Sequence, residues 1–228
     1  MTKPSQLPFD FSLQNEFTFD NFVIAEPNTE VIIQLQTSTE LPEQFYFIWG
    51  PEGAGKSHLF QALCQSTQNA VYVPLKKFAE YGSDILNGLE NMDLVCLDDI
   101  EVILSNKEWE ETLFQFFNDI REKGNKLFIS ALSPPRKVST NLPDLASRLS
   151  WGVVYQLHEL NDEDKISAVQ LRAKNRGIPL NEEVLNYILL RSPRSMGSLV
   201  AVLDKLDQLS LAEKRKVTIP FVRAMMQW

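Results

Sequence analysis

A glycine-rich stretch between an apolar run and a helical pattern constrains the fold of this chain more than any other feature. The run FYFIW, residues 45–49, is too short for a helix and predicts a buried strand. It leads directly into GPEGAGKS, residues 50–57, and a helix is predicted from Lys56 to about residue 67. The stretch fits the pattern G-x-x-x-x-G-K-[ST] at every fixed position. The sequence therefore places a tight turn between a strand and a helix.

This turn has the chemistry of a phosphate-binding loop. Its glycines let the backbone wrap so that N–H groups point at a phosphate, and the start of the following helix adds positive potential. Lys56 would neutralise the β- and γ-phosphates, and the Ser57 hydroxyl would bind Mg²⁺. The other interpretation is a turn without chemical purpose. We predict nucleotide binding by the residues of the turn and the one after it: Gly50, Pro51, Glu52, Gly53, Ala54, Gly55, Lys56, Ser57 and His58.

Two aspartates follow a second buried run, residues 93–97, at the end of a predicted strand. Ligands of parallel sheets gather at the carboxyl ends of the strands, and a phosphate-bound Mg²⁺ usually needs a carboxylate there. We predict that Asp98 is the metal partner and that Asp99 orients a water. The alternative is a pair of aspartates that caps a helix.

The rest of the chain predicts an α/β domain followed by a helical one. Predicted strands at 45–49, 70–75, 93–100, 126–132 and 152–158 alternate with helical segments, which indicates a parallel sheet covered on both faces. From about residue 160 only helices are predicted, each opened by an Asn, Asp, Ser or Thr. We divide the chain into a tail at 1–16, a nucleotide-binding α/β domain at 17–159 and a helical domain at 160–228.

Composition excludes several classes of protein. The formal net charge of -8 argues against a surface built wholly for nucleic acid. No apolar run reaches the roughly 18 residues that span a bilayer, and the start lacks a secretory core, so we expect a cytoplasmic protein without membrane contact. Cys64 and Cys96 are expected to be reduced and buried, and His58 and His158 lie too far apart for a metal site.

The segment 106–124 carries aromatic residues that allow two interpretations. Trp109, Phe114, Phe116 and Phe117 could stack on single-stranded DNA. Aromatic residues at helical spacing, in a helix flanked by strands, are far more often core residues. We expect this helix to pack on the sheet.

Two arginines further along resemble functional residues of AAA+ ATPases. Arg148 lies in the predicted short helix LPDLASRLSWG, and Arg194 opens a helix of the C-terminal domain in SPRSMGSL. In AAA+ proteins the first such arginine acts in trans on a neighbour's nucleotide, and the second touches phosphates from a helical lid. A guanidinium suits both roles because it stays charged and binds oxygens bidentately. Taken alone, an isolated arginine of this kind is more often a surface residue or the partner of a structural ion pair.

Within that superfamily, the chain resembles the DnaA/Hda family of replication-initiation proteins. The likeness rests on FTFDNFVIAEPN at 17–28, SRLSWG at 147–152, LNDEDKISAVQLRA at 160–173 and RKVTIPFV at 215–222. It implies a P-loop AAA+ core with a five-stranded parallel sheet, a small helical lid, and ADP or ATP with Mg²⁺. It also implies that Val23 and Ile24 lie by the base, that Arg194 is the lid arginine, and that Arg148 is a finger presented to DnaA.

The same resemblance gives a role to the tail. In this family an N-terminal peptide binds the DNA polymerase sliding clamp, and the peptide here would use Gln6, Leu7, Phe9 and Phe11. The clamp-bound protein would then stimulate hydrolysis of DnaA-bound ATP and so inhibit initiation. No sequence-specific DNA binding is expected, and a homodimer stays open.

Two departures from the family pattern predict weak or no ATPase activity of the chain itself. Leu132 stands where DnaA-like proteins carry an Asp that senses the γ-phosphate, with Ser130 or Ser133 as uncharged substitutes. Asp99 replaces the Glu common in AAA+ motors. Two other functions stay open: an initiation or helicase-loading accessory that binds partners without promoting hydrolysis, and a small-molecule kinase.

Overall fold

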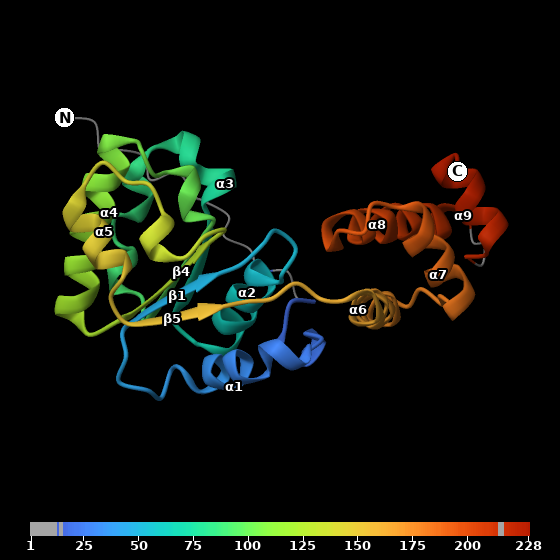
Figure 1. The fold of residues 1–228 in the computed structure, drawn as a ribbon, viewed down its shortest axis with the longest axis horizontal. Helices are drawn as coiled ribbons and strands as arrows, with labels where there is room; N and C mark the ends of the chain where they lie inside the picture. Colours follow the sequence, from blue (N-terminus) through green and yellow to red (C-terminus); the bar gives the residue numbers. More distant parts are fainter. Residues whose placement is uncertain (1–12, 14–15, 214–216) are drawn as a thin grey trace.

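The computed structural model describes Leu13, residues 16–213 and residues 217–228. An α/β domain comes first in the chain, and a group of helices follows it at one end of the molecule (Figure 1). The predicted clamp-binding residues Gln6, Leu7, Phe9 and Phe11 lie outside the described residues. Among the helices of the described residues, none is both long and apolar enough to cross a membrane.

The α/β domain is built on a parallel sheet of five strands in the order β2-β3-β4-β1-β5. The sequence therefore predicted the sheet correctly. β3 was expected to reach residue 100 but ends at Asp98, because Asp99 takes a left-handed conformation with φ 61° that a strand cannot continue. The strands are β1 (Phe45–Trp49), β2 (Ala70–Pro74), β3 (Leu94–Asp98), β4 (Lys126–Ala131) and β5 (Val153–Gln156).

Successive side chains of β1 enter two different cores. Phe45 and Phe47 are buried on one face of the sheet, and Tyr46 and Ile48 are buried on the other. Side chains of a strand alternate between faces, so a strand with only apolar residues needs a covering layer on each side. Both layers are present, which explains why the five-residue apolar run forms a strand.

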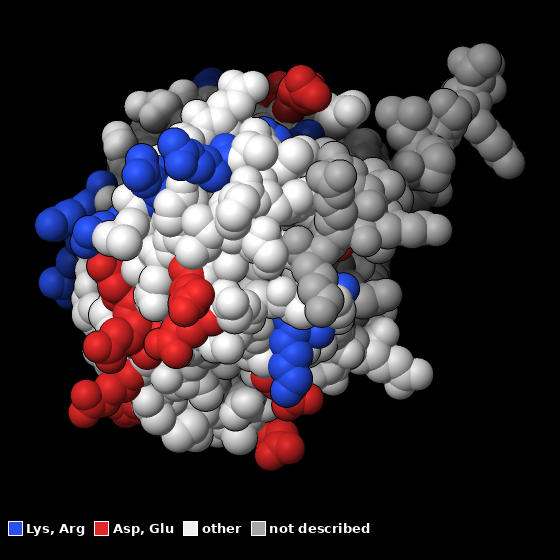
Figure 2. Space-filling model, turned by 90° about the vertical axis from the view of Figure 1, so that its right-hand side faces the viewer, with Lys and Arg blue, Asp and Glu red and all other residues white. Residues whose placement is uncertain are grey.

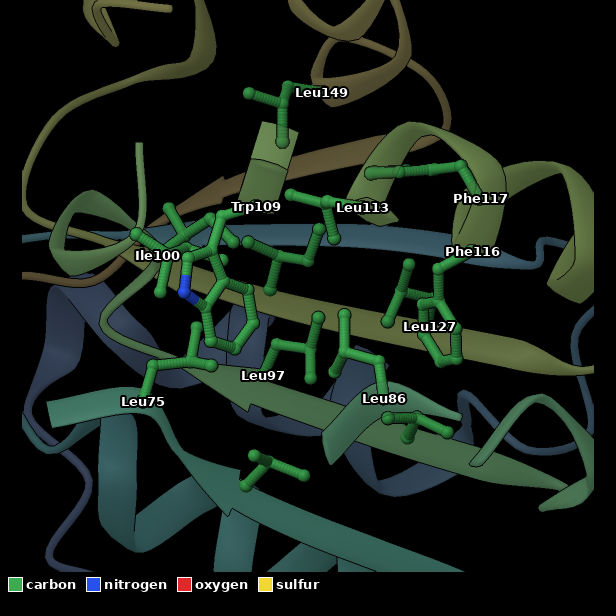
Figure 3. Close-up of a cluster of buried hydrophobic side chains, with 14 of the residues drawn as sticks. Leu75, Leu86, Leu97, Ile100, Trp109, Leu113, Phe116, Phe117, Leu127 and Leu149 are labelled. Carbon is green, nitrogen blue, oxygen red and sulfur yellow. The ribbon is translucent and has the colours of Figure 1, made fainter. Parts of the chain in front are cut away.

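Helices from opposite sides cover the two faces (Figure 1). On one side lie α1 (Thr29–Thr37) and α2 (Lys56–Ser66). On the other lie α3 (Leu75–Phe78), α4 (Lys107–Lys123) and α5 (Pro143–Leu149), together with short 3-10 turns that follow α3 before β3 begins. Figure 3 shows side chains of α4 meeting those of the sheet. Trp109, Phe116 and Phe117 of α4 are buried there, which confirms the core interpretation of the aromatic helix.

The C-terminal helices form a core of their own. They are α6 (Asp162–Asn175), α7 (Glu182–Arg191), α8 (Met196–Glu213) and α9 (Ile219–Met226). As predicted, a polar side chain accepts a backbone N–H at each N-terminus: Asn161, Asn181, Ser195 and Thr218. Cys64 and Cys96 are buried, also as predicted.

Charged side chains of both signs lie on the face that the C-terminal helices present. Viewed from that end, described basic and acidic side chains form separate small groups among uncharged residues (Figure 2). The mixture accords with 22 basic and 30 acidic residues in the whole chain.

Candidate nucleotide-binding site

The glycine-rich loop joins β1 to α2 and requires glycine at specific positions. Gly53 and Gly55 have φ of 81° and 99°, a region that favours glycine. A Cβ on Gly55 would lie 2.7 Å from the ring of Phe22, and one on Gly50 would lie 2.2 Å from the carbonyl oxygen of Leu157. The loop is therefore held tightly between the N-terminal segment and the chain that follows β5.

Lys56 closes this loop from inside. Its Nζ donates hydrogen bonds to the carbonyl oxygens of Gly50, at 2.8 Å, and Pro51, at 2.9 Å. The side chain is buried, and desolvation lowers the pKa of the amine, while Asp99 and Asp98 oppose that shift. A phosphate at the loop would offer this buried cation stronger acceptors than the two carbonyls.

Two neighbouring hollows adjoin the loop. The first, which we name the lid cavity, lies between the N-terminal segment, the loop and the C-terminal helices; it is lined by Glu16, Asn21, Phe22, Val23, Gly53, Ala54, Gly55, His58, Leu160, Ala168, Arg172, Asn175 and Met196. The second, the loop cleft, runs over the loop to the sheet edge; it is lined by Phe17, Glu52, Gly53, Gly55, Lys56, Ser57, His58, Lys76, Asp99, Leu132, Arg172, Met196, Gly197, Val200 and Asp204.

Val23 and Ile24, the two residues predicted to lie by the base, differ in their surroundings. Val23 lines the lid cavity, whereas Ile24 lines neither hollow and is 45% exposed. Adjacent residues of an extended segment point to opposite sides, so only one of them faces the cavity. Of the predicted loop residues, Gly50 and Pro51 also line neither hollow, and both accept hydrogen bonds from Lys56 through their carbonyl oxygens.

Asp98 lies at the end of β3, and each of its two carboxylate oxygens accepts a hydrogen bond from a hydroxyl group. Tyr72 donates to its Oδ2 at 2.8 Å, and Ser130 donates a short hydrogen bond to its Oδ1. The Tyr72 hydroxyl also hydrogen-bonds Ser57, and burial next to Asp98 raises the pKa of the phenol. Ser57 and Asp98, the two predicted metal residues, are thus joined through Tyr72. Hydroxyl and carboxylate oxygens are the donors that Mg²⁺ prefers, so these residues fit that ion.

Asp99 is turned into the loop cleft and paired with a lysine. Its Oδ2 lies 3.2 Å from Nζ of Lys76, and its backbone N–H donates to Ser130 Oγ. Burial and the neighbouring Asp98 raise the pKa of Asp99, and Lys76 counteracts them. Leu132, 45% exposed, lines the same cleft without a polar group. The hydroxyl of Ser130, a predicted uncharged substitute, donates to Asp98 and accepts from the backbone N–H of Asp99.

His58 lies on the first turn of α2 and lines both hollows. Its Nε2 lies 2.8 Å from the Thr18 carbonyl oxygen, so Nε2 carries the proton in this contact. The ring packs against Phe17 and Phe22, with centroids 4.9 and 5.2 Å away. Desolvation is the largest effect on its pKa, which is lowered from 6.5.

The predicted lid arginine lies away from both hollows. Arg194 is exposed, and its guanidinium pairs with Asp162 at 3.0 Å, at the start of α6. Arg172 of α6 lines both hollows instead, and sequence reasoning missed it. The available signal was the spacing of Ala168, Arg172 and Asn175, which places three lining residues on one helix face.

Arg148, the predicted finger, belongs to a different surface. It extends from α5, its guanidinium lies 3.8 Å from the ring centre of Trp151 and 5.1 Å from that of Phe114, and it donates to Asn118 at 3.1 Å. No residue of α5 lines either hollow. Figure 1 shows α5 on the side of the sheet opposite to α2. Arg148 therefore lies away from the loop of its own chain.

The fold and the loop define an AAA+ nucleotide-binding domain with a helical lid, and comparison with known proteins gives its family. Residues 13–156 match the model of the bacterial DnaA ATPase domain, and residues 162–226 match the model of the Hda lid domain. The chain belongs to the bacterial DnaA ATPase family. A Haemophilus influenzae protein named only as uncharacterized is 40% identical over 97% of this chain and 98% of its own length.

Solved structures show the same fold. Domain III of the Thermotoga maritima replication initiation protein DnaA matches with a TM-score of 0.81 and 22% identity, over 95% of this chain and 98% of that one. AMPPCP-bound DnaA from Aquifex aeolicus matches with a TM-score of 0.68 and 20% identity, over 88% and 68%. The Thermotoga maritima RuvB branch migration motor matches with a TM-score of 0.62 and 17% identity, over 92% and 71%.

The lowered pKa of His58 predicts a loss of stability on mild acidification. The folded pKa lies below 6.5, so unfolding takes up a proton as the pH falls below 6.5, and the free energy of unfolding decreases there. Denaturant titrations of the wild type between pH 7.5 and 5.5 should show this slope. His58→Gln keeps an N–H donor for Thr18 but cannot titrate, so we expect a flatter profile below pH 6.5; an unchanged slope would contradict the assignment.

Proposed function

We propose that this chain is a nucleotide-bound regulator of replication initiation that acts on DnaA. In this proposal it holds ADP or ATP at the loop, docks on the DNA polymerase sliding clamp through residues 6–11, and presents Arg148 to the ATP of a neighbouring DnaA. Hydrolysis of that ATP would inactivate the initiator. The alternative is an initiation accessory that binds the same partners without promoting hydrolysis.

Nucleotide binding is supported by the loop, by the cation Lys56 inside it and by the AMPPCP that a DnaA of the same fold binds. The phosphates would lie in the loop cleft and the base in the lid cavity, beside Val23. Mg²⁺ would be held by the nucleotide and the Ser57 hydroxyl, with Asp98 orienting that hydroxyl through Tyr72. The ion would neutralise phosphate charge.

The proposed resident nucleotide is a bound ligand rather than a substrate. A water-activating carboxylate must be free to accept a proton, and Asp99 is paired with Lys76. Leu132 brings no polar group to the γ-phosphate side of the cleft.

We expect the purified chain alone to hydrolyse ATP no faster than its Lys56→Ala variant. Single-turnover measurements with labelled ATP and Mg²⁺ test this. Brisk hydrolysis by the wild type that Lys56→Ala abolishes would show that the cleft supports catalysis, contrary to the proposal.

The position of Arg148 is the main observation in support of the proposed action on DnaA. A finger has to lie on a surface remote from the nucleotide of its own chain, and α5 meets that requirement. Its Nε is buried without a hydrogen-bond partner among the described residues, although the guanidinium stacks on Trp151. A guanidinium held by stacking keeps donors for a transition-state phosphate, and fingers supplied in trans accelerate hydrolysis by roughly 10³ to 10⁵ in nucleotide-hydrolysing switches.

Arg148→Ala should abolish the stimulation of DnaA-ATP hydrolysis and leave binding to DnaA and to the clamp intact. The measurement is conversion of DnaA-bound ATP to ADP in the presence of DNA-loaded clamp. Arg136→Ala is the control, because Arg136 is an exposed arginine close in sequence to α5. Full stimulation by Arg148→Ala would favour a binding accessory over a hydrolysis-promoting regulator.

The predicted clamp contact has a separate test. Gln6→Ala combined with Leu7→Ala removes one polar and one apolar anchor from the peptide, so binding of the intact chain to purified clamp should fall by at least tenfold in surface plasmon resonance. Ser5→Ala with Ser12→Ala is the matched double variant, since these two positions flank residues 6–11. Equal clamp affinity of wild type and Gln6→Ala, Leu7→Ala would remove the peptide from the mechanism.

A further inference from the structure

The first turns of α8, which belongs to the helical lid, place no basic side chain in the lining of the loop cleft. Met196, Gly197 and Val200 are the residues of its first turns that line the cleft, and all three are uncharged. Arg194, just before them, is 65% exposed and turned towards Asp162. A Cβ on Gly197 would meet nothing within 4 Å, so the space in front of this turn is open.

One basic side chain of α6, that of Arg172, does line the loop cleft. Arg172 lines both the lid cavity and the loop cleft, and its side chain is 19% exposed. The guanidinium carbon lies 4.7 Å from the ring centre of Phe17, which in turn packs against His58 at the start of α2. Stacking on an aromatic ring orients a guanidinium while leaving its edge N–H groups for hydrogen bonds. Arg172 is therefore fixed at the junction of the two hollows.

The charge of Arg172 is only partly used by the protein. It pairs with Glu16 through one nitrogen, at 2.5 Å, and its Nε is buried with no partner among the described residues. Arg176, one turn later, makes the stronger contact with that carboxylate: its Nε and a terminal nitrogen donate to the two oxygens of Glu16 at 2.8 and 2.7 Å. Hydrogen bonding from Arg176 is the largest cause of the lowered pKa of Glu16.

Arg176 also reaches Asp204 of α8 at 2.5 Å, and it lines neither hollow. The two arginines therefore make different contacts. Arg176 joins the N-terminal segment to α6 and α8, whereas Arg172 lines both hollows. An arginine has five N–H donors, so a single ion pair leaves Arg172 able to bind two phosphate oxygens.

We propose that Arg172 is the lid residue that binds the phosphates of a nucleoside diphosphate in the loop cleft, and that Glu16 is its positioning residue. The proposal rests on the proposed binding of nucleotide at the loop. It places the phosphates between Lys56 at the loop and Arg172 at the lid. Arg194 then has no contact with the nucleotide, and its pair with Asp162 is structural.

The test compares ADP with adenosine, because only ADP carries the phosphates. Isothermal titration calorimetry of the full chain with Mg²⁺ measures both affinities for the wild type, Arg172→Ala, Arg172→Lys, Arg176→Ala and Arg194→Ala. Loss of a charge-assisted contact should weaken ADP binding by Arg172→Ala about 10- to 100-fold and change adenosine binding less than about twofold. Arg172→Lys should recover part of the loss, since the charge remains but the fork is lost.

Arg194→Ala should bind ADP like the wild type. Arg176→Ala is the structural control, because it breaks the larger share of the Glu16 contact on the same helix face without removing a donor from the hollows. If Arg172→Ala and Arg176→Ala weaken ADP and adenosine alike, Arg172 acts through the fold of the lid and the proposal is wrong. A loss of ADP affinity in Arg194→Ala with Arg172→Ala unaffected would also overturn it.

Lys56→Ala separates this proposal from nucleotide binding itself. If Lys56→Ala no longer binds ADP and Arg172→Ala binds it like the wild type, nucleotide binding at the loop is supported and the proposed role of Arg172 is wrong. If the wild type binds neither ADP nor ATP, both fall. Cooperative thermal unfolding of each variant confirms that the lid is folded in the comparison.

Discussion

Burial of β1 on both faces is the constraint on which the rest of the molecule depends. Phe47 belongs to the core under α4 and Ile48 to the core over α2, so a slip of one residue in register would exchange the two sets. This burial fixes the register of β1. Gly50, which follows the strand, then lies against the carbonyl group of Leu157, and a Cβ on Gly50 would lie 2.2 Å from that oxygen. The shape of the loop follows from the packing of the strand before it.

The polar groups at the carboxyl edge of the sheet bind one another closely. Asp98 is held by Tyr72 and Ser130, Asp99 by Lys76, and Lys56 by the carbonyls of the loop. Buried polar groups left without partners are costly, so these contacts stabilise the site before any ligand arrives. The same contacts engage both carboxylates at this edge, and the proposal that the nucleotide is a bound ligand rests on them.

Sequence patterns predicted the sheet and the loop because each depends on near neighbours in the chain: alternate burial along a strand, and glycines at fixed spacing. They were less informative where the position of a side chain depends on contacts with residues far away in the sequence. Arg172 lies within α6 and Arg194 lies just before α8, and only the fold shows that Arg172 contacts the N-terminal segment while Arg194 pairs with Asp162. The end of β3 at Asp98 likewise depends on one backbone angle, that of Asp99, which periodicity does not encode.

Ion pairs among Glu16, Arg172, Arg176 and Asp204 connect three parts of the chain: the N-terminal segment, α6 and α8. Glu16 follows the peptide predicted to bind the clamp, while Arg176 also holds α8 through Asp204. Ligands that bind at either end of such a connection obey thermodynamic linkage: if occupancy of the tail alters the free energy of the lid, occupancy of the lid alters the affinity of the tail by the same factor. If the proposed clamp binds the tail and the proposed nucleotide binds the loop cleft, this cluster of four side chains would couple the two binding events reciprocally.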